Sequence, residues 1–200
     1  MIRVLIAEDQ TLLRGAIAAL LSLEKDIEVV GQASDGLEAL ELAKKHSPDV
    51  LLTDIEMPGI SGIELAKTLQ KSSSSIRVLI VTTFARPGYL ERARAAGVQG
   101  YMLKDAPSET LAMSIRKVSK GQVVIEKGLM DSVWTIQDPL NERERKILSL
   151  AEQGKTNKAI ANELSLAVGT VRNYLADITQ KVGAKNRIEA FRIARENGWL

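Results

Sequence analysis

The chain has 200 residues, of which 45% are hydrophobic and 26% are charged, and its formal net charge is +2. It contains no cysteine, which excludes disulfide bonds, thiolate catalysis and cysteine-ligated zinc and favours a reducing compartment. No apolar run approaches the roughly 20 residues that cross a bilayer, and the N-terminus has no signal-peptide pattern. We therefore expect a cytoplasmic protein of two domains that does not insert into a membrane.

The first 120 residues alternate short apolar runs rich in β-branched residues with amphipathic helical patterns. This alternation is typical of a parallel sheet wrapped by helices. It predicts an α/β fold of the flavodoxin-like, doubly wound type, with five strands in the order 2-1-3-4-5 and a helix after each strand. The predicted strands are Ile2–Ala7, Glu28–Ala33, Val50–Thr53, Val78–Val81 and Gly100–Leu103.

Residues 121–138 break this rhythm, and we interpret them as a linker with a possible short helix at Leu129–Trp134. After Pro139 the strand patterns disappear, which predicts a small all-α domain over residues 139–200. Asn141 followed three residues later by Glu144 has the spacing of a capping box, and glycines stand where helices should end. The four predicted helices are Glu142–Glu152, Asn157–Leu164, Val168–Val182 and Arg187–Glu196.

Polar residues follow four of the predicted strands, at ends that meet in one crevice of an open parallel sheet. Clustered carboxylates repel one another unless a hard cation neutralises them, and an oxygen-only site suits Mg²⁺. A carboxylate there can attack a phosphoryl group to form an aspartyl-phosphate, while a lysine and a threonine bind the phosphoryl oxygens. Any one of these residues is more often a solvated or capping residue, but their joint placement favours a site. They are Glu8 and Asp9, Asp54, Thr82 and Thr83, and Lys104.

This half of the chain resembles the receiver domain of two-component response regulators through four motifs. They are Ala7-Glu8-Asp9-Gln10, Asp54-Ile55-Glu56-Met57-Pro58-Gly59, Thr82-Thr83 and Gly100-Tyr101-Met102-Leu103-Lys104-Asp105.

The resemblance implies that a sensor histidine kinase phosphorylates Asp54. It also implies that Mg²⁺ is held by Glu8, Asp9, Asp54 and the backbone carbonyl of Glu56. Thr82, Thr83 and Lys104 would bind the phosphoryl group, and Tyr101 would rotate as Thr82 moves. Many receivers have a proline and a cis bond after the lysine, whereas Asp105 follows here, so the isomer of this bond stays open.

The C-terminal part carries most of the positive charge. Residues 139–200 have 11 Lys and Arg against 7 Asp and Glu, a net charge of +4, whereas residues 1–120 have 15 of each. This balance suits a nucleic-acid partner, although ordinary helical domains can carry as much. Three stretches resemble the helix-turn-helix of LuxR/NarL-type regulators, namely Leu140-Asn141-Glu142-Arg143-Glu144, Gly154–Ala161 and Gly169–Tyr174.

This second resemblance implies binding to double-stranded promoter DNA. Arg172 and Asn173 would read base edges, while Gly169 and Ala176 stand where relatives often carry polar or basic residues. The remaining predicted contacts are to phosphates, which position the protein without reading sequence. They come from Lys155, Thr156, Asn157, Lys158, Thr170, Lys181, Lys185 and Asn186.

The last predicted helix has more apolar surface than a small bundle needs, including Ile188 and Phe191. We expect it to form part of a homodimer interface after phosphorylation, with packing into the domain core as an alternative of nearly equal weight. A dimer would require paired half-sites in the DNA.

Together these features predict a transcriptional response regulator that is not an enzyme beyond its own phosphorylation and dephosphorylation. Two alternatives are a phosphohydrolase that uses Glu56 as acid and base, and a scaffold that works without phosphate. The DNA-binding domain and the Glu8-Asp9 pair favour the regulator. Within the family, three stretches resemble a regulator of desaturase genes and imply control of membrane-lipid genes, namely Ile55–Gly59, Thr83–Tyr89 and Gly169–Tyr174.

Overall fold

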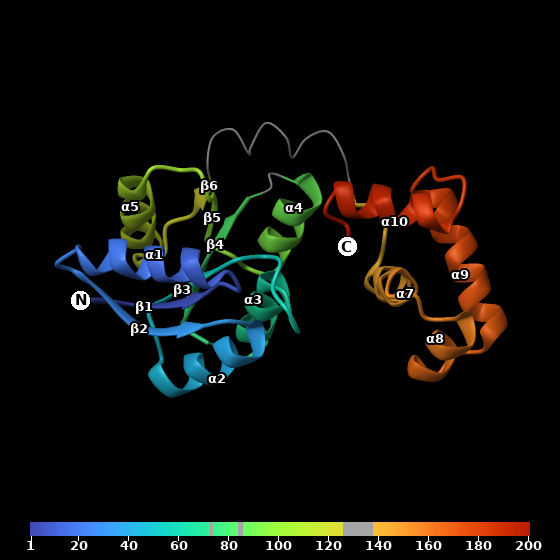
Figure 1. Ribbon diagram of the computed structural model, residues 1–200, viewed down its shortest axis with the longest axis horizontal. Coiled ribbons are helices and arrows are strands. Elements are labelled where there is room, and N and C mark those ends of the chain that lie inside the picture. The colour runs from blue at the N-terminus through green and yellow to red at the C-terminus, as the bar shows by residue number, and fades with distance from the viewer. Residues whose placement is uncertain (73, 84–85, 126–137) are drawn as a thin grey trace. The chain divides into compact units, whose positions relative to one another are not determined.

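The computed structural model describes residues 1–72, 74–83, 86–125 and 138–200, which fold into two compact units. The first unit contains a parallel sheet with helices on both faces, and the described residues of the second form helices and no strand (Figure 1). This is the predicted fold class. The possible helix at Leu129–Trp134 lies outside the described residues. Among those that are described, no helix is long and apolar enough to span a membrane.

The sheet of the first unit is parallel and has the order β2-β1-β3-β4-β5-β6. The predicted order of the first five strands is confirmed, but the prediction of five strands in total is wrong. A sixth strand, β6 (Val124–Ile125), lies inside the predicted linker. Two residues show no periodic pattern of their own. β6 exists because it pairs with the exposed edge of β5, where the Val124 amide donates to the Gln99 carbonyl at 2.8 Å.

The other strands match their predicted ranges to within a residue at each end. Most of their side chains are buried, as expected for parallel strands covered on both faces. Their bounds are β1 (Ile2–Ala7), β2 (Ile27–Ala33), β3 (Val50–Thr53), β4 (Arg77–Thr82) and β5 (Gly100–Leu103).

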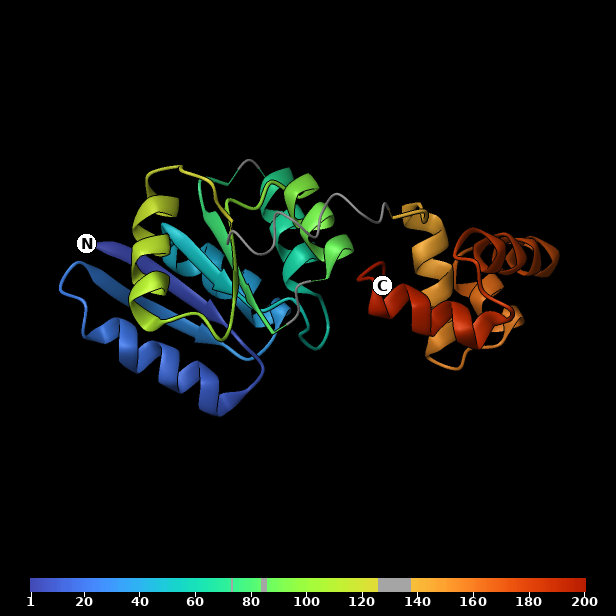
Figure 2. The ribbon, with the colours of Figure 1, turned by 90° about the horizontal axis from the view of Figure 1, so that it is seen from above.

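Five helices cover the two faces of this sheet (Figures 1 and 2). α1 (Thr11–Ser22) and α5 (Ser108–Ser119) lie on one face, where Ile17 and Ile115 join a single apolar core with alternate strand residues. α2 (Gly36–His46), α3 (Gly62–Lys71) and α4 (Pro87–Ala95) lie on the other face.

The second unit contains α7 (Glu142–Glu152), α8 (Asn157–Glu163), α9 (Val168–Lys181) and α10 (Arg187–Glu196). The predicted capping box at the start of α7 is confirmed, and the glycines that end helices have positive φ angles of 69° to 81°. α8 and α9 are joined by residues 164–167, in which Ser165 has the left-handed φ of 53°. They share a buried core made of Ile160, Ala161, Val171, Leu175 and Ile178.

Candidate functional site

The polar residues beyond β1, β3 and β5 lie together at one edge of the sheet. Carboxylate oxygens of Glu8, Asp9 and Asp54 lie within 4.8 Å of one another. The Nζ atom of Lys104 lies 2.9 Å from Glu8 Oε2 and 2.9 Å from Asp54 Oδ2. Glu8 and Asp54 are buried and Asp9 is exposed. One ammonium group therefore serves two buried carboxylates, with a third carboxylate facing solvent.

Backbone groups fix the orientation of both buried carboxylates. The Ile55 amide donates to Asp54 Oδ1 at 2.7 Å, which leaves Oδ2 for Lys104. The Gln10 amide donates to Glu8 Oε1 at 3.2 Å. The Thr53 hydroxyl donates to the Asp54 carbonyl at 2.9 Å. Asp54 is thus held by contacts on both carboxylate oxygens and on its main chain.

Gly62 supports Asp54, which was not predicted from the sequence. A Cβ atom on Gly62 would lie 1.9 Å from the Asp54 carbonyl oxygen, so no other residue can begin α3 this close to the site. The Gly62 amide also donates to the Ile55 carbonyl at 3.0 Å. The available signal was a Ser-Gly pair at the start of a helix soon after Asp54, with Ser61 as the helix cap.

The charges of this cluster are incompletely balanced. Burial raises the pKa of Asp54 and of Glu8 above their ordinary values, although the hydrogen bond from Lys104 lowers both. Burial alone would lower the pKa of Lys104, but its contacts with Glu8 and Asp54 outweigh this and raise it. Three carboxylates against one ammonium leave an excess of negative charge. Such an all-oxygen donor set fits a hard divalent cation.

The two threonines differ in environment. Thr82 is buried and is the last residue of β4, whereas the sequence analysis placed it beyond that strand. β4 is longer than predicted because Thr82 pairs with Leu103, and the Lys104 amide donates to the Thr82 carbonyl at 2.8 Å. Thr83 is exposed. The bond between Lys104 and Asp105 is trans, since the described residues contain no cis peptide.

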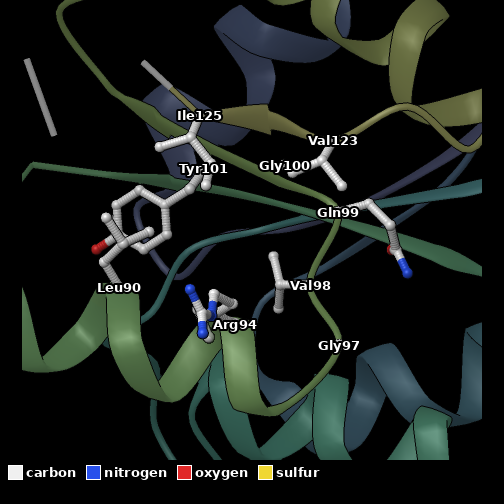
Figure 3. A pocket seen from close by; sticks show the side chains of 10 residues that line it. Leu90, Arg94, Gly97, Val98, Gln99, Gly100, Tyr101, Val123 and Ile125 are labelled. Carbon is white, nitrogen blue, oxygen red and sulfur yellow. The ribbon is translucent and has the colours of Figure 1, made fainter. Parts of the chain in front are cut away.

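Tyr101 lies on β5, two residues before Leu103, and its side chain is only 1% exposed. It lines a cavity of about 360 Å³ between α4, β5 and β6. Figure 3 shows its ring beside Leu90 and Ile125. Because Tyr101 pairs with Ile80 while Leu103 pairs with Thr82, Tyr101 and Thr82 belong to the same face of the sheet, one diagonal step apart.

In the second unit, α9 presents the residues expected to read bases. Arg172 and Asn173 are exposed, while Val171, Leu175 and Ile178 on the opposite side of the helix are buried. This arrangement leaves Arg172 and Asn173 outside the core and available to a ligand.

Four of the eight predicted phosphate contacts already have partners within the protein. Thr156 Oγ1 accepts from the Ala159 amide at 3.2 Å and caps α8. Asn186 Oδ1 accepts from the first turn of α10. Lys155 pairs with Glu163. Lys181 Nζ lies 2.6 Å from Glu144 Oε1. The other four are exposed or half-buried, namely Asn157, Lys158, Thr170 and Lys185.

Glu144 is almost completely buried, and both of its oxygens are used. Oε1 accepts from Lys181, and Oε2 accepts from the Asn141 amide at 2.9 Å. Burial raises its pKa, but the hydrogen bond from Lys181 and the other contacts outweigh burial, so the net pKa is below its ordinary value. This carboxylate therefore joins the start of α7 to the end of α9 as a stable ion pair.

The apolar residues of α10 divide between core and surface. Ala194 is buried, and Phe191 and Ile193 are half-buried against the core of the unit. Ile188 is 71% exposed. Core packing thus explains most of the apolar surface that the sequence analysis noted, and Ile188 remains as an exposed apolar side chain.

Comparison with known proteins agrees with both units. Residues 4–116 match the family model described as response regulator receiver domain, and residues 138–194 match bacterial regulatory proteins of the luxR family. The chain is 49% identical to the transcriptional regulatory protein DesR and 52% identical to the uncharacterized transcriptional regulatory protein YvfU. Both come from Bacillus subtilis (strain 168), and both matches cover 100% of each chain.

Among solved structures, the response regulator ChrA of a heme-sensing two-component system is similar over the full chain. Its sequence identity is 33% and its TM-score 0.59, with 100% of this chain and 98% of ChrA covered.

Proposed function

Because the chain belongs to the two-component response regulators, with a receiver domain and a LuxR-type DNA-binding domain, we propose that phosphorylation of Asp54 by a sensor histidine kinase promotes dimerisation and promoter binding. The relatives are transcriptional regulators, which argues against the phosphohydrolase alternative. The observation that carries the proposal is the position of Asp54, with one oxygen on the Ile55 amide and the other on Lys104.

In this proposal a carboxylate oxygen of Asp54 attacks the phosphorus of a phosphohistidine on the kinase. An O–P bond forms as the N–P bond breaks, and the imidazole leaves. Attack by a carboxylate needs no general base, because a carboxylate has no proton to lose. The Lys104 ammonium, now shared between Asp54 and Glu8, would donate to a phosphoryl oxygen and balance its charge. The hydroxyl groups of Thr82, the last residue of β4, and of Thr83, which follows it, would donate hydrogen bonds to the same phosphoryl oxygens.

Mg²⁺ fits the excess of negative charge in this cluster. Glu8, Asp9 and Asp54 would hold it, with the Glu56 carbonyl as the fourth protein ligand that the family resemblance implies. When bound, the cation would neutralise charge on the attacking and transferred groups.

The same proposal makes Tyr101 the residue that reports phosphorylation to the surface. Thr82 would move toward the phosphoryl group, and the Tyr101 ring would follow along the shared face of the sheet. The cavity beside Tyr101 supports this assignment because it gives the ring room to change position.

For the second unit we propose that Arg172 and Asn173 of α9 read bases in a major groove. The predicted contacts to DNA phosphates would come from residues around the start of α8, at both ends of α9 and just before α10. Exposed Ile188 would contribute to the dimer interface.

Because three stretches of the sequence resemble a regulator of desaturase genes, we propose membrane-lipid genes as targets. We propose domain bounds of 1–120 for the receiver, 121–138 for the linker and 139–200 for the DNA-binding domain, with Val124–Ile125 of the linker adding β6 to the receiver sheet. The match to the luxR family begins one residue before the last of these domains.

The experiment incubates the protein with Mg²⁺ and acetyl phosphate, then measures intact mass, oligomeric state and DNA affinity beside Asp54→Ala. We expect the wild type alone to gain one phosphoryl group, to dimerise and to bind promoter DNA more tightly. Equal DNA affinity of the treated and untreated wild type would contradict the switch. A phosphoryl gain in Asp54→Ala would contradict the assignment of Asp54.

A further inference from the structure

One exposed face of α9 carries two residues with little or no side chain, Gly169 and Ala176. Successive helix residues are separated by about 100°, so Gly169, Arg172, Asn173 and Ala176 fall within one arc of about 100°. All four are exposed. The buried residues of α9 lie on the opposite side of the helix. The face that carries both base-reading candidates is therefore flanked by the smallest side chains.

The fold does not require glycine at position 169. Its φ is not among the positive values that mark the glycines ending α7 and α9, and a Cβ atom there would meet nothing within 4 Å. Gly62 differs sharply, since its Cβ would strike the Asp54 carbonyl. A glycine within a helix is destabilising relative to alanine. Position 169 thus carries a cost that no contact within the described residues explains.

A missing side chain is useful where a backbone must approach a ligand closely. In a major groove, forked side chains reach base edges only if the helix axis lies close to the bases. Leucine or lysine at position 169 would stand on the same face as Arg172 and would hold the first turn of α9 away from the groove.

We infer that Gly169 is a specificity-determining position for DNA binding, because its lack of a side chain lets α9 approach the bases that Arg172 and Asn173 read. Ala176, two turns further along the same face, extends this shallow strip. The inference rests on the proposed DNA-binding function and adds a steric requirement to it. It concerns discrimination between DNA sequences and not the overall attraction to DNA.

The test uses the full chain treated with Mg²⁺ and acetyl phosphate. The wild type selects its preferred duplex from a random 24-base-pair pool, and affinities for this duplex and for a random duplex are then measured. Gly169→Leu and Gly169→Lys should each lower the ratio of these affinities by about tenfold or more, the effect of disrupting one two-bond contact to a base. Gly169→Ala should lower it by about threefold.

The lysine variant separates sterics from electrostatics. An added positive charge should strengthen binding to the random duplex and steepen its salt dependence by about one power of salt concentration. The steric inference expects weaker binding to the selected duplex in the same variant. Gly15→Leu is the matched control. Gly15 is also an exposed helical glycine with open space, but it lies on α1 in the receiver unit, so its ratio should stay at the wild-type value.

Hydrogen exchange of the α9 amides distinguishes a folding defect from a defect in DNA recognition. Gly169→Ala should slow exchange in α9 while lowering the affinity ratio, whereas a structural defect would raise exchange and weaken binding together. If the leucine variant fails to fold, the alanine and lysine variants still test the inference. A ratio within twofold of the wild type in the folded variants would overturn the inference alone. Failure of the wild type to enrich any sequence would contradict the proposed function itself.

Discussion

Two lysine–carboxylate clusters with buried carboxylates, one in each unit, have opposite electrostatic character. At the sheet edge, Lys104 serves both Glu8 and Asp54, and burial raises the pKa of both carboxyl groups. In the helical unit, Lys181 serves Glu144 alone, whose remaining oxygen caps α7, and the pKa of this carboxyl is lowered. Similar residue types thus make an unbalanced cluster in one place and a balanced pair in the other.

The difference indicates what each cluster is for. A balanced pair lowers the energy of the folded unit and needs no further partner. In an unbalanced cluster the carboxylates repel one another until a cation binds or one carboxylate is chemically modified. Groups whose pKa values are perturbed in this way gather at functional sites. Four experiments, with progressively smaller expected effects, test this contrast.

Lys104→Met should have the largest effect on stability. It leaves two buried carboxylates without the ammonium group that they share, and breaking a buried ion pair from one side costs about 3–5 kcal/mol. Hydrogen exchange of β1, β3 and β5 would measure the loss. Lys155→Met is the control, because its pair with Glu163 is partly exposed and should cost less than about 1 kcal/mol. Equal losses of stability in the two variants would contradict the expected difference between a buried and an exposed ion pair.

Lys181→Met should destabilise the helical unit by about 1–3 kcal/mol, since it leaves the Glu144 oxygen buried without a donor. The effect should be smaller than at Lys104, because one carboxylate loses its partner and the Lys181 side chain is 43% exposed. Lys181→Arg should retain most of the stability by keeping the charge. Urea unfolding followed by hydrogen exchange of α7 and α9 would measure both variants. A full loss in the arginine variant would mean that packing, and not charge, matters there.

Mg²⁺ should stabilise the first unit only. At a metal concentration ten times the dissociation constant, binding to the folded state alone adds about 1.4 kcal/mol. Calorimetry of the full chain should show one transition that rises with Mg²⁺ and another that does not. Asp9→Asn, which changes the exposed carboxylate, should weaken the rise with little effect on folding. A rise of both transitions would contradict the assignment of the metal to the sheet edge.

Acid should remove part of the stability of the helical unit. The pKa of Glu144 is lowered from 4.5 in the folded state, so the unfolded chain binds this proton more readily. Its stabilising contribution is therefore complete above about pH 4.5 and is lost as the pH falls through the lowered value. In Glu144→Gln, this component of the acid dependence of α7 and α9 exchange should be absent.

Much of the fold follows from local pattern. Apolar strand runs, helical periodicity and the capping box at Asn141 depend on neighbours along the chain, so the five main strands and the four C-terminal helices were predictable. The strand order then followed from the doubly wound topology. β6 was not, because two residues become a strand only when the edge of β5 is available to pair with them. The extension of β4 through Thr82 has the same origin.

The candidate site divides in a similar way. Residue type and position at strand ends predicted that Glu8, Asp9, Asp54 and Lys104 would meet, because the ends of parallel strands converge. The sequence could not assign Lys181 to Glu144, since the two are 37 positions apart and meet only when α7 packs against α9. Nor could it separate the roles of the glycines, which depend on what lies within reach of a Cβ atom.

The fold class, the order of the five main strands and the kinds of polar group at the sheet edge could be predicted, because they depend on short-range pattern and on a fixed topology. How the charges are shared depends on the folded arrangement. Which carboxylate is balanced by which lysine, which glycine is required by packing and which is open, and whether two residues become a strand all depend on distances between segments remote in sequence.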